Sequence, residues 1–232
     1  MSVIARLRST FFSLGWHNGL WYLLGQALHR MNPRWNIYKY DLVAQPVAAH
    51  ARLTGRQGAS IEIRPILEHD PAIAAMGRPE TVIKQRFKQG CVCLGAFKAD
   101  ELVGYVWLQL GAYLEDEVRC CFIPQPAQQA AWDFDIFVHP KQRIGFAFAK
   151  LWDAADAFMR ARGIHWSMSR ISAFNIASLA AHKKLGLKSI GATVYVVLGN
   201  TQITMSNLFP FVHVSLSPAQ LPCFRINAPR GL

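Results

Sequence analysis

The sequence feature that most constrains the fold is a strand that turns directly into a helix near the middle of the chain. Residues 132–138 alternate apolar and acidic side chains, as a half-buried strand does. From 145 to 162 apolar residues recur at helical spacing, and Gly163 follows as a usual residue just beyond a helix end. Another strand is predicted at 164–171. This order predicts a βαβ unit, whose two strands are parallel.

The elements on either side of this unit complete the predicted sheet. Strands are predicted at 61–64, 91–97, 102–110, 189–198 and 202–205, and helices at 65–90 and 175–185. Gly77 and Pro79 are expected to split the first of these helices in two. The order predicts an α/β fold with a mixed, mostly antiparallel sheet, a central βαβ unit and helices on both faces.

Composition excludes some classes of protein. The 232 residues are 52% hydrophobic and 17% charged, which is incompatible with a disordered chain. The five cysteines are odd in number and have no CxxC spacing, which argues against a disulfide framework and against a zinc site. We therefore expect cysteines in the core, no metal, and a reducing compartment.

The N-terminal segment carries a long uncharged run. Residues 9–28 have no formal charge, and Arg6, Arg8 and Arg30 flank them. Aromatic and leucine residues suit a helix on an anionic membrane surface, but polar residues and glycines interrupt the run. Three interpretations stay open: a helix packed on the domain, an amphipathic helix at a membrane surface, and a membrane span. Residues 31–60 are interpreted as a connector, in which IYKYDLV can form an extra strand.

The charge distribution favours an anionic partner. The net charge is +11, and from residue 157 to the end there are eight basic residues and no acidic one. Cofactor phosphates, anionic lipid or nucleic acid would each suit such a surface. Nucleic acid is not expected, because no compact cluster of basic residues alternates with aromatic ones.

The turn from strand to helix predicts a phosphate site. Its sequence is Gln142, Arg143, Ile144, Gly145, Phe146, Ala147. The first N–H groups of a helix lack partners within the helix and lie at the positive end of its dipole, so they bind phosphate. Gly145 would let a diphosphate approach the backbone without meeting a Cβ atom.

Two motifs at this spacing resemble the GNAT superfamily of acyl-CoA-dependent N-acyltransferases. The first is a strand ending in V-x-P, here Val138 and Pro140, followed by [Q/R]-x-x-G-x-[G/A] at 142–147. The second is N-x-x-[A/S]-x-x-x-Y-x-K-x-G-F, which Asn175, Ser178, Lys184 and Gly186 match. The sequence departs from this motif in having His182 for the tyrosine and Leu187 for the phenylalanine.

The resemblance implies a cofactor site. The backbone of Ile136, Phe137 and Val138 would pair with the pantetheine arm of acetyl-CoA or another acyl-CoA, and residues 142–147 would bind its diphosphate. Asn175 and Ser178 would line its path, although Asn175 can equally be a plain helix N-cap.

Catalytic roles are predicted for three side chains. Asp133 and Asp135 are expected on one face of their strand, where a carboxylate could take the proton of the amine. By the resemblance, His182 would protonate the departing thiolate, although it can also be a helix-surface residue. The acidic run 115–117 is interpreted as a solvated loop.

The sequence thus predicts three regions: an N-terminal amphipathic helix and connector at 1–57, a GNAT-like acyltransferase domain at 58–206, and a tail at 207–232. The expected activity is transfer of an acyl group, most simply acetyl, from acyl-CoA to an amine by direct attack. The alternatives are a membrane-associated long-chain N-acyltransferase resembling an N-acyl amino acid synthase, and a non-catalytic acyl-CoA-binding or membrane-interaction module. We expect a cytoplasmic protein that can contact the inner face of an anionic membrane through residues 1–30.

Overall fold

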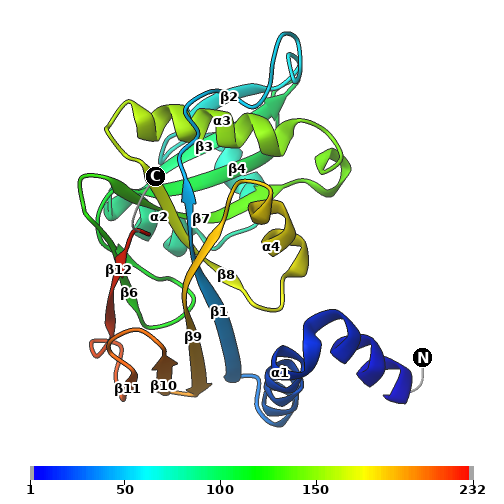
Figure 1. The fold of residues 1–232 in the computed structure, drawn as a ribbon, viewed down its shortest axis with the longest axis vertical. Coiled ribbons are helices and arrows are strands. Elements are labelled where there is room, and N and C mark those ends of the chain that lie inside the picture. The colour runs from blue at the N-terminus through cyan, green and yellow to red at the C-terminus, as the bar shows by residue number, and fades with distance from the viewer. Residues whose placement is uncertain (1–2, 230–232) are drawn as a thin grey trace. The chain divides into compact units, whose positions relative to one another are not determined.

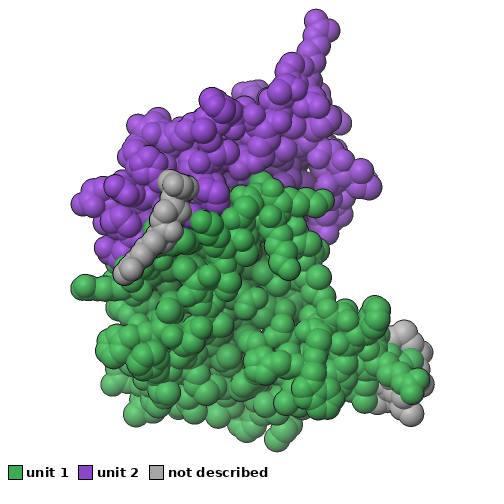
Figure 2. All heavy atoms as spheres, in the orientation of Figure 1, with its two compact units in different colours: residues 1–45, 114–123, 169–231 green, residues 46–113, 124–168, 232 purple. Residues whose placement is uncertain are grey.

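The computed structural model describes residues 3–229 and divides into two compact units (Figure 2). The first unit consists of residues 1–45, 114–123 and 169–231, and the second of residues 46–113 and 124–168. The chain passes between them several times, so each unit is built from separate stretches of sequence.

The second unit contains the predicted βαβ unit. Its strands lie in the order β8-β7-β4-β3-β2, in which β7 and β8 are parallel and the other neighbours are antiparallel (Figure 1). The elements are β2 (Glu62–Ile66), η1 (Pro71–Met76), α2 (Glu80–Lys88), β3 (Val92–Lys98), β4 (Glu101–Gln109), β7 (Ala130–Val138), η2 (Pro140–Gln142), α3 (Ala147–Arg160) and the start of β8 (Trp166–Ser172). Gly77 ends the short 3-10 helix η1 before α2 begins, as the sequence predicted.

Helices cover both faces of this part of the sheet. A Cβ atom added to Gly104 on β4 would lie 3.1 Å from the Leu151 side chain of α3, so α3 packs closely on that face. On the opposite face, the Trp107 ring packs edge-on against Phe87 of α2, and Tyr105 donates to the carbonyl of Met76. Apart from Asp156, which forms an ion pair with Arg52, the buried residues of α3 are apolar, and their burial drives the packing.

The first unit contains a second group of strands, in the order β11-β10-β9-β1-β8. Its elements are α1 (Val3–Met31), β1 (Trp35–Pro46), the end of β8, α4 (Ile176–Lys183), β9 (Lys188–Leu198), β10 (Thr201–Ser206), β11 (Val212–Ser215) and β12 (Cys223–Asn227). A small sheet pairs β12 with β6 (Cys121–Gln125), and β6 with β5 (Tyr113–Leu114). The extra strand at IYKYDLV is confirmed as part of β1. The strands β11 and β12 in the tail were not predicted.

The N-terminal helix is confirmed, but it is kinked rather than continuous. Gly15 adopts φ 73° and ψ 170°, which is outside the helical region, so α1 consists of two helical segments. The second segment packs on β1, where Gly25 lies against Ile37 and the Lys39 ammonium lies 2.9 Å from the His17 ring and 2.5 Å from Asn18 Oδ1. Among the described residues, no helix is long and apolar enough to cross a membrane.

The cysteines follow the prediction of core positions with one exception. Cys91, Cys93, Cys120 and Cys121 are buried and reduced, whereas Cys223 is exposed. The division into regions at 1–57, 58–206 and 207–232 stays a prediction.

Candidate functional site

Strand β7 has a β-bulge at the position where the sequence predicted chemistry. Tyr105 of β4 pairs with Phe137 and Trp107 pairs with Phe134, so β7 has one more residue than β4 in this stretch. Asp135 lies in the bulge with φ 48°, a left-handed conformation that is uncommon for a residue with a side chain. Bulges of this kind bend a strand and often lie beside functional sites.

The bulge lies where the pairing of β7 changes. Within the second unit, the parallel ladder between β7 and β8 consists of three pairs, from Ala130–Trp166 to Trp132–Met168. The ladder between β7 and β4 continues to Val138. Because N–H groups alternate along a strand and that of His139 donates to Val103, the N–H of Val138 points to the edge opposite β4. An extended amide chain could pair with that edge.

The turn that follows β7 is held by its own backbone. His139 accepts a hydrogen bond from the N–H of Lys141 through its ring, and its carbonyl accepts from Gln142. Arg143 donates from Nε to the carbonyl of Val138 at 3.2 Å, and the Gly145 N–H donates to Gln142 at 3.1 Å. The turn therefore has a defined shape before any ligand binds.

The N-terminus of α3 fits a phosphate group. Its N-cap residue, Phe146, makes no side-chain hydrogen bond to the helix, and the first turn has no acidic residue. A Cβ atom on Gly145 would meet only the carbonyl of Gln142, at an ordinary 3.4 Å, and the φ of Gly145 is not positive. The fold therefore does not require glycine at position 145. Close approach of an anion to the backbone would require it, because a Cβ atom would be in the way.

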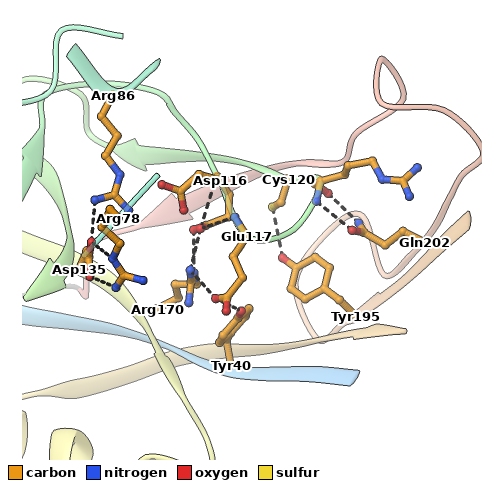
Figure 3. Close-up of polar contacts among 12 residues, drawn as sticks. Tyr40, Arg78, Arg86, Asp116, Glu117, Cys120, Asp135, Arg170, Tyr195 and Gln202 are labelled. Atoms are coloured by element: carbon orange, nitrogen blue, oxygen red, sulfur yellow. Dashed lines mark hydrogen bonds and ion pairs between the residues drawn. The ribbon is translucent and has the colours of Figure 1, made fainter. Parts of the chain in front are cut away.

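Asp135 is held by two arginines (Figure 3). Arg78 donates from both Nε and a terminal nitrogen, and Arg86 Nη1 lies 2.6 Å from Oδ2. The Arg86 guanidinium also lies over the rings of Trp107 and Phe134, at 5.2 and 5.1 Å from their centroids. The hydrogen bonds to Asp135 also raise the pKa of Arg78, against the opposing effect of burial. Asp135 is thus an anchor that joins the bulge to α2 and the segment before it.

The prediction that Asp133 and Asp135 share one face of their strand is wrong. Asp133 pairs with Leu108, on the face covered by α3, and accepts a 2.6 Å hydrogen bond from Ser167. Asp135 lies with Arg86 on the face covered by α2. The extra residue of the bulge breaks the period of two that the prediction assumed.

The second motif forms helix α4 in the first unit. Asn175 is its N-cap and accepts a hydrogen bond from the N–H of Ser178 at 3.1 Å, as expected for a capping residue. His182 is buried rather than on the helix surface, and its Nδ1 lies 2.8 Å from the carbonyl of Ser178. Since a carbonyl only accepts, Nδ1 is the donor in this contact.

The structure therefore gathers the predicted site residues in two groups. Those from Asp133 to Ala147 lie together in the second unit, and Asn175, Ser178 and His182 lie together in the first. The roles predicted for them in cofactor binding and catalysis stay predictions. Among the described residues, no group of three or more histidine, cysteine, aspartate or glutamate side chains could hold a metal ion.

A buried ion-pair network in the first unit was not predicted from the sequence. The run 115–117 is solvated only in part. Asp116 and Glu117 are exposed, but the side chain of Glu115 is 1% exposed and accepts two hydrogen bonds from Arg170, at 2.6 and 2.7 Å. Arg170 also lies 2.9 Å from Glu117, which accepts a 2.6 Å bond from the hydroxyl of Tyr40. Burial opposes ionisation of Glu115, but the charge and hydrogen bonds of Arg170 hold its pKa below the usual value.

The comparisons with known proteins show a similarity of fold. No family model matches the sequence, and no curated protein matches it. A functionally unknown conserved protein from Staphylococcus epidermidis matches with a TM-score of 0.50 and 11% identity, over 75% of this chain and 66% of that chain. An acetyltransferase from Trypanosoma brucei matches with a TM-score of 0.42 and 17% identity, over 56% and 93% of the two chains. A tandem GNAT protein from the clavulanic acid biosynthesis pathway matches with a TM-score of 0.46 and 14% identity, over 71% and 55%.

Sequence identities this low are evidence for a shared fold and for nothing more. The mostly antiparallel strands, the parallel β7–β8 pair joined through α3, and the helices on both faces confirm the fold class predicted from the sequence. The chain has a mixed α/β fold with an added N-terminal helix.

Proposed function

We propose that this protein is an acyl-CoA-dependent N-acyltransferase that transfers an acyl group, most simply acetyl, to an amine. The observation that carries the proposal is the continuous path from the bulge at Asp135 to the uncapped N-terminus of α3. This stretch of one unit offers an extended backbone edge followed directly by a turn and a helix terminus that suit a diphosphate.

The chain's own residues would hold acyl-CoA in two places. The N–H groups at the start of α3 would bind the diphosphate, with Gly145 leaving room for it and the basic residues Lys141 and Arg143 beside it. The edge of β7 near Val138 would pair with the amide groups of the pantetheine arm, as an added strand pairs with a sheet edge.

Acyl transfer would proceed by direct attack. The amine nitrogen bonds to the thioester carbonyl carbon, the carbon–sulfur bond breaks, and sulfur leaves with the electron pair. The N–H of Val138 is the donor we assign to the carbonyl oxygen as negative charge develops on it. An acyl-enzyme is not expected on Cys93, because burial raises the pKa of its thiol and keeps the thiolate scarce.

The contacts of the three predicted catalytic side chains favour structural roles. Asp133 is 1% exposed and bonded to Ser167, and both oxygens of Asp135 are engaged by arginines. His182 is 2% exposed and bonded to its own helix. We therefore propose that water takes the amine proton and that positioning and backbone electrostatics supply the rate acceleration.

A long-chain acyl donor is the second candidate, and the exposed aromatic side chains of α1 favour it. Phe12 and Trp16 are 94% and 74% exposed, which suits a protein that works beside lipid. Donor chain length separates the two candidates.

The test is a transfer assay with acetyl-, decanoyl- and palmitoyl-CoA against a panel of small amines, amino acids and amino sugars, measured by released thiol. We expect thiol release that depends on both donor and amine, with acetyl-CoA as the best donor. A preference for palmitoyl-CoA would select the long-chain candidate. Binding of CoA without turnover on any acceptor would contradict the proposed activity and leave a non-catalytic binding module.

A further inference from the structure

The strands of the first unit have two faces, and one of them is largely covered. On that face, Tyr195 and Thr204 are completely buried, and the Tyr195 hydroxyl donates to Cys120. Gln202 exchanges hydrogen bonds with the backbone of Arg119, at 2.8 Å in each direction. Residues 114–123, which include the buried Glu115, thus form the cover of this face.

The opposite face is covered only in part. Helix α1 packs on it over β1, and the cross-strand register continues from β1 through β9 and β10 to β11. Two rows of side chains follow this register: Ile37, Val196, Ile203 and Val214 in one, and Lys39, Val194, Met205 and Val212 in the other. Exposure rises along the rows to 51% at Val214 and 66% at Val212. An apolar sheet face therefore extends beyond the helix that covers its start.

Helix α1 turns a second apolar surface away from the sheet. Trp16, Leu20 and Leu24 of the second helical segment are spaced by four residues, Phe12 lies just before the kink, and all four are exposed. The residues that contact β1, among them Asn18 and Gly25, lie on the other side of the helix. The Phe11 ring stacks on Trp16 across the kink, 4.9 Å between centroids. We call these four residues, with Val212 and Val214, the apolar surface; both of its parts lie on the same side of the sheet.

The two sides of the sheet in this unit differ in the sign of their charged residues. Its stretches of sequence contain twelve lysines and arginines and four acidic residues. Three of the acids, at 115–117, belong to the cover on the opposite face. The exposed Arg8, Arg30 and Arg34 belong to α1 and the turn after it, and Arg8 shares a hollow with Phe12 and Trp16. The apolar surface is thus bordered by positive charge.

We propose that the apolar surface docks on an anionic lipid bilayer, with α1 lying in the interface and the uncovered strands beside it. Aromatic and leucine side chains enter the boundary between headgroups and acyl chains, and arginines near the headgroups add about 1 kcal/mol each of attraction. A second copy of the chain is the less favourable occupant, because two surfaces with this excess of positive charge repel each other. This inference does not depend on the proposed enzymatic activity.

The test is sedimentation of the full chain with vesicles of phosphatidylcholine alone or with 30% phosphatidylglycerol. We expect binding to the anionic vesicles that weakens as salt is raised. Phe12→Ser with Trp16→Ser should weaken binding by about 100-fold, since each buried aromatic side chain contributes at least tenfold. Val212→Thr with Val214→Thr, which keeps β-branched residues in the strand, should weaken it by about tenfold. Arg8→Ala with Arg30→Ala should weaken it by about 30-fold.

Matched controls in the second unit keep the test specific. Leu67→Ser removes a side chain that is 69% exposed, and Arg56→Ala removes an exposed charge; both should bind like the parent. Unchanged thermal melting shows that each variant is folded. Failure of the parent to bind anionic vesicles, or equal losses in the control variants, would overturn the proposal. The proposal would also be overturned if the parent did not bind vesicles but formed a dimer in light scattering that the Phe12 and Trp16 substitutions dissociate.

Discussion

Replacing Glu115 by glutamine is expected to destabilise the protein by about 3 kcal/mol. Glu115 is 1% exposed and Arg170 is 17% exposed, and two hydrogen bonds at 2.6 and 2.7 Å join them. Removing one partner of a buried ion pair costs about 3–5 kcal/mol, because the remaining charge loses its compensation. The lower end applies here, since glutamine keeps one acceptor oxygen and Glu117 stays 2.9 Å from Arg170. At about 2–4 °C per kcal/mol for a chain of this size, the Tm should fall by about 6–12 °C.

The measurement is thermal and urea unfolding of the parent and two variants. Glu68→Gln is the matched control, because it makes the same chemical change at an exposed position outside this network. It should change the free energy of unfolding by no more than about 0.5 kcal/mol. Equal effects of the two substitutions, or a loss below about 1 kcal/mol for Glu115→Gln, would show that the network does not hold the fold as argued.

Three further predictions concern pH, the bulge and catalysis. The folded-state pKa of Glu115 lies below its ordinary value, so its contribution to stability is present above about pH 4.5 and is lost as the pH falls through the folded pKa. Glu115→Gln should therefore flatten the acid side of a plot of the urea unfolding midpoint against pH. Asp135→Asn should cost about 2–3 kcal/mol in urea unfolding, because Arg86 is only 4% exposed, whereas Asp100→Asn in an exposed turn should cost almost nothing. Asp133→Asn and His182→Gln, which keep hydrogen-bonding groups, should leave the pH dependence of kcat unchanged. If either limb of the pH–rate profile were lost and the rate fell by about 100-fold or more, the substituted residue would be a general acid or base.

The sequence predicted the parts of the fold that depend on local pattern. The strand at 132–138, the helix after Gly145 and the N-cap at Asn175 each rest on neighbouring residues, and each is observed. Strand β1 was anticipated from IYKYDLV for the same reason. The short strands β11 and β12 lie in a tail that contains four prolines and has little clear periodicity.

What the sequence could not predict depends on contacts between distant residues. The burial of Glu115 follows from Arg170, which lies 55 positions away, so the run 115–117 resembled a solvated loop in isolation. The bulge at Asp135 follows from the register between β7 and β4, which alternation alone does not specify. The one sequence feature that pointed to the bulge was the pair of aspartates in an otherwise apolar strand. Buried carboxylates need charged or hydrogen-bonding partners, and such partners constrain the strand.

The central claim is that the turn before α3 binds the diphosphate of acyl-CoA, and titration of acetyl-CoA into the parent and two variants tests it most directly. Gly145→Glu adds a carboxylate at the N-terminus of α3, and Ala161→Glu adds the same group at an exposed position just beyond its other end. The parent and Ala161→Glu should bind alike, and at 100 times Kd both should gain about 2.7 kcal/mol, or about 5–11 °C in Tm. Gly145→Glu should melt like the ligand-free parent and lose binding by at least about 100-fold, because like charges would meet at the helix terminus. Equal binding by all three proteins, or no binding by the parent, would contradict the assignment of this turn.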